Sequence, residues 1–182
     1  GLGIEAAARK VRYEALLKGY FDGLMLAQHQ EDQVETFILQ LLRGAGLKGL
    51  SAMARFDSDK RIMRPLLDIS RQEIERYASH MLLSWVEDES NQDTSFDRNY
   101  CRHELMPIIE KRFPAAQKTL ARSVSHIAEA ASLLDDLAEI DAQRYLTETA
   151  LKVDAVQDLS EERAKNLMRW WLARQEIGRA HV

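Results

Sequence analysis

The side chains best suited to chemistry lie in one short segment, residues 28–46. On a helix with 3.6 residues per turn, its polar side chains share one face: His29, Asp32, Thr36, Gln40 and Arg43. The opposite face is apolar, with Glu35 at its border, and consists of Val34, Phe37, Ile38 and Leu41. Arg43 is followed by close-approach glycines at 44 and 46. An arginine and backbone amides of this kind can hold an anionic ligand.

Two other interpretations of this segment stay open. Acidic residues in a first helical turn also complement the helix dipole, with no functional role. A zinc site on His29 with Asp32 or Glu35 is the poorest interpretation, because the chain has no second pair of ligands with metal spacing. We therefore assign no metal ligand.

A second segment, residues 85–107, is rich in Asp, Ser and Asn in its first half, which predicts a structured loop. In the second half of the segment, Arg98 and Arg102 lie one helical turn apart and are expected to point the same way. Two guanidinium groups on one face suit phosphates, of ATP or of RNA. The alternative is a helix capped by Ser95 or Asp97 that carries surface arginines.

The first 110 residues alternate between helical and strand-like patterns. Helices are expected at 3–20, at about 31–43 and from Ser70 to about 80, where Ser70 and Glu73 form a capping-box pattern. Strands are expected at 24–27, 61–64 and 82–86. This alternation predicts an α/β fold with a parallel sheet. The helix at 31–43 then begins at the carboxyl edge of a strand, where such sheets bind ligands.

From about residue 113 the pattern is helical alone, with a last helix that begins at Ser160. The expected organisation is a partial nucleotide-binding domain at 1–110 and an all-helical domain at 111–176. The chain lacks an initial Met and opens in a helical pattern, so we expect a truncated gene product. Residues 177–182 match the translation of a sequencing adapter and are expected to be a non-native tail.

Composition excludes several classes of protein. The 182 residues are 46% apolar and 30% charged, and no apolar run is long enough for a membrane span. One cysteine, Cys101, excludes an internal disulfide framework and fits a cytosolic setting. The net charge of −4 gives no general sign of nucleic-acid binding, although local patches matter more than the total.

Taken in order along the chain, these motifs resemble one family, the tRNA(Ile)-lysidine synthetases, which are PP-loop (HUP-like) ATP pyrophosphatases. The resemblance covers residues 1–110 and rests on the D-Q-x-E-T run at 32–36, Arg43-Gly44, Gly49–Met53, Arg64–Leu66, Glu87–Asn91, Arg98-Asn99, Arg102 and Pro107. Two departures stand out. Glu31 occupies the position of the first Asp of the family's pair, a change that keeps a carboxylate and is expected to be tolerated. The S-G-G-x-D-S phosphate loop, whose backbone amides should bind the ATP phosphates, does not occur in the sequence. We therefore expect the chain as written to be inactive and assign no ATP-binding residue.

The resemblance implies a reaction for the intact protein. ATP, with Mg²⁺, adenylates C2 of the wobble cytidine in the isoleucine tRNA that has a CAU anticodon, and the amine of free lysine then replaces AMP. Asp32 and Glu35 would bind the lysine ammonium and assist its deprotonation. Arg98 would stabilise phosphate charge or the base. The candidates for substrate or tRNA contacts are His29, Arg43, Asn91 and Arg102.

Two rival functions need separating from this one. The first is another PP-loop tRNA-modifying enzyme, but thiolation enzymes generally carry cysteine pairs and this chain has one cysteine. The second is a non-catalytic tRNA-binding helical module. It fits the missing phosphate loop but does not explain the two acids, Asp32 and Glu35, on one helix edge.

Overall fold

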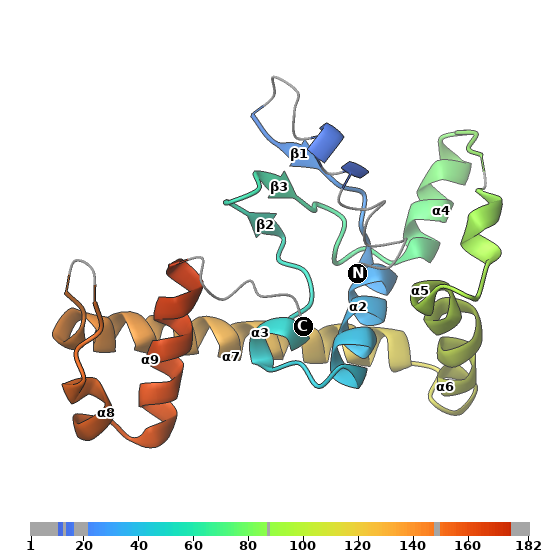
Figure 1. Cartoon of the computed structure of the whole chain (residues 1–182). Helices are drawn as coiled ribbons and strands as arrows, with labels where there is room; N and C mark the ends of the chain where they lie inside the picture. Colours follow the sequence, from blue (N-terminus) through green and yellow to red (C-terminus); the bar gives the residue numbers. More distant parts are fainter. Residues whose placement is uncertain (1–10, 13, 17–21, 87, 148–149, 176–182) are drawn as a thin grey trace. The chain divides into compact units, whose positions relative to one another are not determined.

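Two short strands of the small sheet lie where the sequence predicts them (Figure 1). In the computed structural model, which describes residues 11–12, 14–16, 22–86, 88–147 and 150–175, strand β1 is Leu24–Met25 and strand β3 is Ile62–Met63. They pair in parallel, with Leu24 opposite Ile62. The unpredicted strand β2, Phe56–Asp57, pairs antiparallel with β3, which gives the order β1-β3-β2. The expected α/β fold with a parallel pair is confirmed, in a mixed sheet.

The predicted strand at 82–86 is wrong. This segment has no regular secondary structure, and Leu82 and Val86 are 92% and 95% exposed. Leu82 has a φ of 53°, a left-handed conformation that ends the preceding helix and does not suit a strand. Apolar residues alone suggested a strand here, but none of the described strands pairs with the segment.

Helix α2, Gln30–Leu42, begins five residues after β1 and confirms the predicted helix at 31–43. Val34, Phe37 and Ile38 are buried, as their positions predict. Leu41 was expected on the same buried face but is 53% exposed, because it lies in the last turn, past the buried part of the helix. The short helix α3, Leu47–Leu50, follows the glycine-containing turn.

Helix α4, Arg71–His80, confirms the predicted capping box. Glu73 N donates to Ser70 Oγ at 3.3 Å, and Ser70 N donates to Glu73 Oε2 at 2.9 Å. These bonds satisfy amide groups that a helix start leaves without partners, and so fix where α4 begins.

The second arginine-bearing segment is a run of short helical pieces. A 3₁₀ turn, η1, spans Glu89–Gln92, and α5 (Asp97–Tyr100), the π-helical turn η2 (Cys101–Leu105) and α6 (Met106–Arg112) follow. Phe96 occupies the N-cap position of α5, so neither Ser95 nor Asp97 caps it as the alternative interpretation required. Because π turns are frequent at functional sites, η2 directs attention to the residues it carries.

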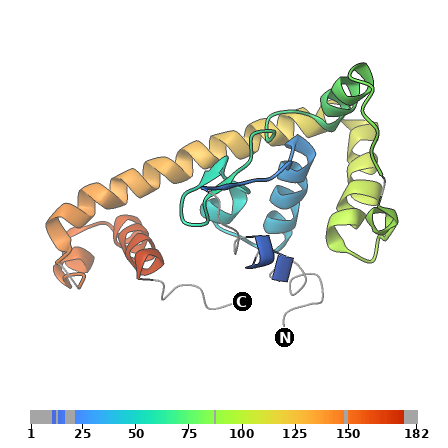
Figure 2. The same ribbon diagram turned by 90° about the horizontal axis from the view of Figure 1, so that it is seen from above.

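Two compact units divide the chain, Gly1–Val124 and Ser125–Val182. The predicted boundary near 110 stays a prediction, and the predicted helix at 3–20 and the tail at 177–182 lie mostly or wholly outside the described residues. Helix α7, Ala116–Tyr145, is one long continuous helix (Figure 2). Among the described residues, no helix has the length and apolar character needed to cross a bilayer.

The second unit has a small core of its own. Helices α8, Asp154–Asp158, and α9, Glu161–Arg174, follow α7. The core consists of Ala142, Tyr145, Ala155 and Leu167. Ser160 caps α9, as predicted, by accepting from the backbone amide of Arg163 at 3.4 Å.

Candidate active site

The start of α2 is closed by its own cap and tied to two other segments. His29 N donates to Asp32 Oδ2 at 2.9 Å, which closes the first turn. The backbone amide of Arg71, the first residue of α4, donates to Glu31 Oε2 at 2.9 Å. The Gln33 side-chain amide pairs with the backbone of Met53 through two bonds of 2.8 Å. The carboxylates of this turn are therefore held on a fixed scaffold.

Glu35 is the most buried acid in the described first unit, at 2% exposure. Arg102 of η2 donates hydrogen bonds to both carboxylate oxygens of Glu35: Nε lies 2.7 Å from Oε1 and Nη2 lies 3.0 Å from Oε2. Burial raises the pKa of the Glu35 carboxyl above its ordinary value, although the hydrogen bond and charge of Arg102 act in the opposite direction. Glu35 is thus a stronger base than an exposed glutamate.

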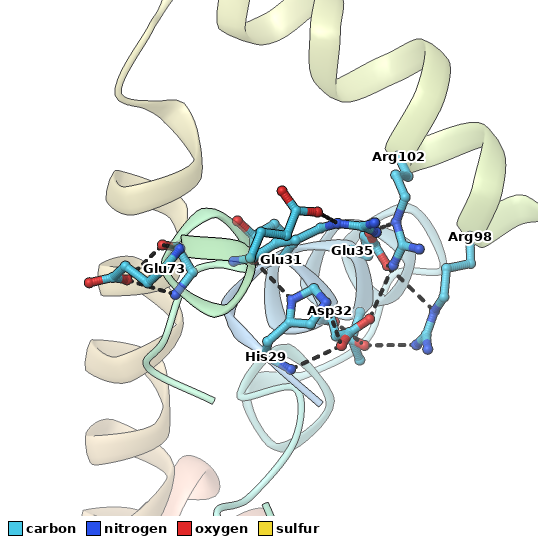
Figure 3. Close-up of polar contacts among 11 residues, drawn as sticks. His29, Glu31, Asp32, Glu35, Glu73, Arg98 and Arg102 are labelled. Atoms are coloured by element: carbon cyan, nitrogen blue, oxygen red, sulfur yellow. Dashed lines mark hydrogen bonds and ion pairs between the residues drawn. The ribbon is translucent and has the colours of Figure 1, made fainter. Parts of the chain in front are cut away.

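Arg102 also joins the two catalytic candidates. Its Nη2 lies 3.2 Å from Asp32 Oδ1, so one guanidinium contacts both Asp32 and Glu35 (Figure 3). The side chain of Asp32 is 13% exposed, which makes it the more accessible of the two acids. The acids were predicted to lie on one helix edge, and the structure places them against a common cation.

Arg98 approaches Glu35 from α5. Its Nη2 donates to Thr36 Oγ1 at 3.0 Å, and its Nε lies 3.8 Å from Glu35 Oε2. The hydroxyl of Thr36 in turn donates to the backbone oxygen of Asp32 at 2.7 Å. The Arg98 and Arg102 side chains are 28% and 22% exposed, so they are not the surface arginines of the alternative interpretation.

His29 completes the cluster from the N-cap position of α2. Its Nδ1 lies 2.9 Å from Glu31 Oε2, and its Nε2 lies 3.5 Å from Asp32 Oδ2. Burial disfavours the charged imidazole, but the hydrogen bond to Glu31 and the charge of Asp32 outweigh it and raise the pKa of His29. The same contact lowers the pKa of Glu31 against the effect of its own burial.

Two predicted site residues lie outside this cluster. Arg43, at the end of α2, pairs with Asp97 at 3.4 Å, and both side chains are exposed. Asn91 lies in η1, where its backbone oxygen is 2.8 Å from His103 Nε2. The structure therefore brings together Asp32, Glu35, Arg98, His29 and Arg102 of the predicted set.

Sequence reasoning missed other residues that shape the site. Thr36 orients Arg98, and its place on the polar face of α2 was the signal that could have indicated it. Arg64, 7% exposed, donates to Gln28 Oε1 at 2.6 Å and to Ala54 O at 2.8 Å, which fixes the chain just before His29.

Burial raises the pKa of the Cys101 thiol to about 11, which leaves it protonated and unreactive at neutral pH.

The cluster can bind a cation and accept its proton. Its acids lie at different depths, and its arginines can neutralise phosphate charge at one edge. Among the residues that the structure describes, no three His, Cys, Asp or Glu side chains are arranged to hold a metal ion.

Comparisons with known proteins agree with this architecture. The chain is similar to the tRNA(Ile)-lysidine synthase of Nitrosomonas europaea, with 53% identity over 179 residues that cover 96% of this chain and 39% of the relative. The corresponding proteins of Coxiella burnetii and Pseudomonas fluorescens are 44% and 42% identical, over 94% of this chain and 39% and 42% of theirs. The chain thus spans about two fifths of the length of these curated relatives. A family model described as a PP-loop domain matches residues 1–109, and the chain belongs to the PP-loop domain family.

Proposed function

We propose that the full-length protein joins lysine to C2 of the wobble cytidine in the isoleucine tRNA with a CAU anticodon, using ATP. The observation that carries this proposal is the convergence of Asp32 and Glu35 with Arg98 and Arg102, from segments more than 60 residues apart in the chain. The similarity to relatives named tRNA(Ile)-lysidine synthase supports the same assignment.

The reaction has two steps. The C2 oxygen of cytidine first attacks the α-phosphorus of ATP, and the bond to pyrophosphate breaks. The lysine side-chain nitrogen then bonds to C2, the bond from C2 to the AMP oxygen breaks, and the nitrogen gives up protons. Because lysine arrives as an ammonium ion, the second step needs a group that binds the cation and takes a proton. ATP, lysine and tRNA are all available together in the cytoplasm, which is where we place the reaction.

The depth of the two acids suggests a division of labour. Asp32, the more accessible acid, would meet the ammonium first, and its bond to Arg102 would yield to the new cation. Glu35, whose pKa is raised by burial, would be the better proton acceptor. Arg98 lies beside Glu35 and would face the negative charge of the departing AMP. Exposed Arg43 suits the RNA backbone.

The test is lysine-dependent release of AMP by the full-length protein in the presence of ATP and the CAU isoleucine tRNA. We expect AMP to appear only when lysine is present, with lysine recovered in the tRNA. Release that ignores lysine, or a modified base that contains sulfur, would identify another PP-loop enzyme. Binding of tRNA without any turnover would favour the non-catalytic module.

A further inference from the structure

A cavity lies beside the carboxylate cluster, and the reaction described above does not use it. Its volume is about 350 Å³, and its lining combines one face of α4 with the irregular segment that follows, namely Arg71, Ile74, Glu75, Ala78, Leu83, Ser84 and Trp85, together with His29. This volume is within the usual range for small-ligand pockets. His29 belongs both to the cavity wall and to the cluster, so the two sites share a side chain.

We propose that this cavity receives a nucleobase of the tRNA anticodon loop that neighbours the reacting cytidine, stacked on Trp85. The inference rests on the proposed function, because it takes tRNA to be the macromolecular substrate. It adds a second base-binding position that holds the loop while the cytidine lies at the cluster.

The chemistry of the lining favours a flat, aromatic ligand. Ile74, Ala78 and Leu83 supply apolar contacts. Trp85, a residue that is 55% exposed, supplies an aromatic ring. Stacking of bases on aromatic side chains is a general means of binding single-stranded RNA, and it tolerates any base because each has a π face. Trp85 belongs to the segment at 82–86, which has no regular secondary structure.

The rim of the cavity supplies polar groups for the edge of a base. Arg71 Nε donates to Glu75 Oε1 at 2.7 Å, which holds the guanidinium while leaving its other N–H groups for a ligand or water. The imidazole of His29 lies at the same wall.

The position of the cavity argues for a neighbouring base and not for the reacting one. Figure 3 shows Glu73 of α4 on one side of His29, and Arg98 and Arg102 on the other. The cavity lies on the α4 side, whereas the groups assigned to phosphate charge lie on the arginine side. A base in the cavity is therefore separated from the arginines by His29 and the acids.

The first test measures the affinity of the full-length protein for an anticodon stem-loop RNA of the CAU isoleucine tRNA. Trp85→Ala should weaken binding by about 5- to 150-fold, the usual loss when one stacked base loses its aromatic partner. Trp85→Phe should retain most of the affinity. Tyr77→Ala is the matched control, because Tyr77 is an exposed aromatic residue of α4 outside the cavity lining, and it should bind like the unaltered protein.

A second variant blocks the cavity without removing the tryptophan. Ala78→Leu adds volume to the wall and should weaken RNA binding while thermal unfolding stays close to that of the unaltered protein. Unchanged RNA affinity in both Trp85→Ala and Ala78→Leu would overturn the inference. If these two variants bind RNA normally but have a raised KM for lysine, the cavity is a lysine subsite and the inference is likewise overturned.

The inference and the proposed function fail in different ways. If Trp85 governs RNA affinity but no lysine-dependent AMP release occurs, the base site stands and the proposed reaction is wrong. If lysine-dependent AMP release occurs and Trp85→Ala binds RNA normally, the reaction stands and the base site is wrong. A full-length protein that does not bind the stem-loop RNA overturns both.

Discussion

Two buried acids in this chain each face an arginine, and they differ in what surrounds them. In the second unit, Asp141 of α7 is 4% exposed and pairs with Arg163 of α9, whose Nε lies 3.2 Å from Oδ2. In the first unit, Glu35 is 2% exposed and pairs with Arg102. Both pairs join elements that are distant in sequence, so burial and pairing alone do not separate a structural acid from a reactive one.

The difference lies in the balance of charges and in access. Among the described residues, Arg163 binds one acid, whereas Arg102 binds both Glu35 and the more accessible Asp32. The cluster on α2 also includes His29, which lines a cavity, while Asp141 joins two helices of one unit. A shared arginine leaves each acid partly compensated, and a cationic substrate can complete the compensation. The presence of a second carboxylate on the same arginine, and not burial alone, therefore distinguishes the candidate reaction centre from the structural pair.

The largest expected effect separates the two acids by activity. In the full-length protein, Asp32→Asn or Glu35→Gln should lower kcat for lysidine formation by about 10²- to 10⁴-fold, the range for loss of a general base. Asp141→Asn should lower the thermal midpoint and leave kcat near normal. Equal turnover in Glu35→Gln and Asp141→Asn would remove the distinction between the two sites.

The next effect concerns stability and its pH dependence. Arg102→Met leaves Glu35 buried without its cation and should cost about 3 kcal/mol of unfolding free energy at pH 8. Burial already raises the pKa of Glu35, and loss of Arg102 raises it further. The folded state then binds a proton that the unfolded state does not, so stability falls as pH rises through the folded-state pKa.

Urea unfolding at pH 8 and pH 5 measures this dependence. The loss in Arg102→Met should be smaller at pH 5, and adding Glu35→Gln should recover part of it at pH 8. The Arg163→Met variant provides the comparison, with a smaller loss expected because the Arg163 side chain is 45% exposed. A loss in Arg102→Met that is identical at both pH values would contradict the assigned role of Glu35.

A smaller effect is expected where the two units use the same local device. Ser70 caps α4 in the first unit and Ser160 caps α9 in the second. Either serine changed to alanine should lower the unfolding free energy by about 1 kcal/mol. Only Ser70→Ala should also weaken RNA binding, because α4 lines the cavity. Matched RNA affinities in the two variants would argue against a role for α4 in binding.

The smallest stability effect is expected at the exposed ion pairs. Arg43 with Asp97 and Arg144 with Asp158 are both exposed pairs, at 3.4 Å and 3.3 Å. Either arginine changed to alanine should alter the unfolding free energy by less than about 1 kcal/mol. Arg43→Ala should additionally reduce the salt dependence of RNA binding by about one unit of slope if it contacts a phosphate. An unchanged slope would exclude Arg43 from the RNA interface.

Local signals in the sequence predict the elements that carry the site. The Ser70 and Glu73 pair predicts the start of α4 because both partners lie within one turn. The spacing of Arg98 and Arg102 predicts that they face the same way, and both do contact α2. Such predictions succeed because the interacting groups are close in sequence.

Features that depend on distant partners could not be predicted. The contact of Arg102 with Glu35 joins residues 67 positions apart, and helical spacing alone gives no sign of it. The two-residue strand β2 depends on its pairing with β3. The segment at 82–86 looks like a strand by composition, but the left-handed conformation of Leu82 and the lack of a partner among the described strands override that pattern.

We propose that Asp32 and Glu35 serve the attack by lysine and not the activation by ATP. The most direct measurement follows the two steps separately in the full-length Glu35→Gln protein, as pyrophosphate release and as lysine transfer to the tRNA. We predict that pyrophosphate is still released from ATP in the presence of tRNA while lysine transfer is lost. Lysine transfer at the normal rate, or loss of pyrophosphate release with lysine transfer from a preformed adenylate intact, would contradict the account.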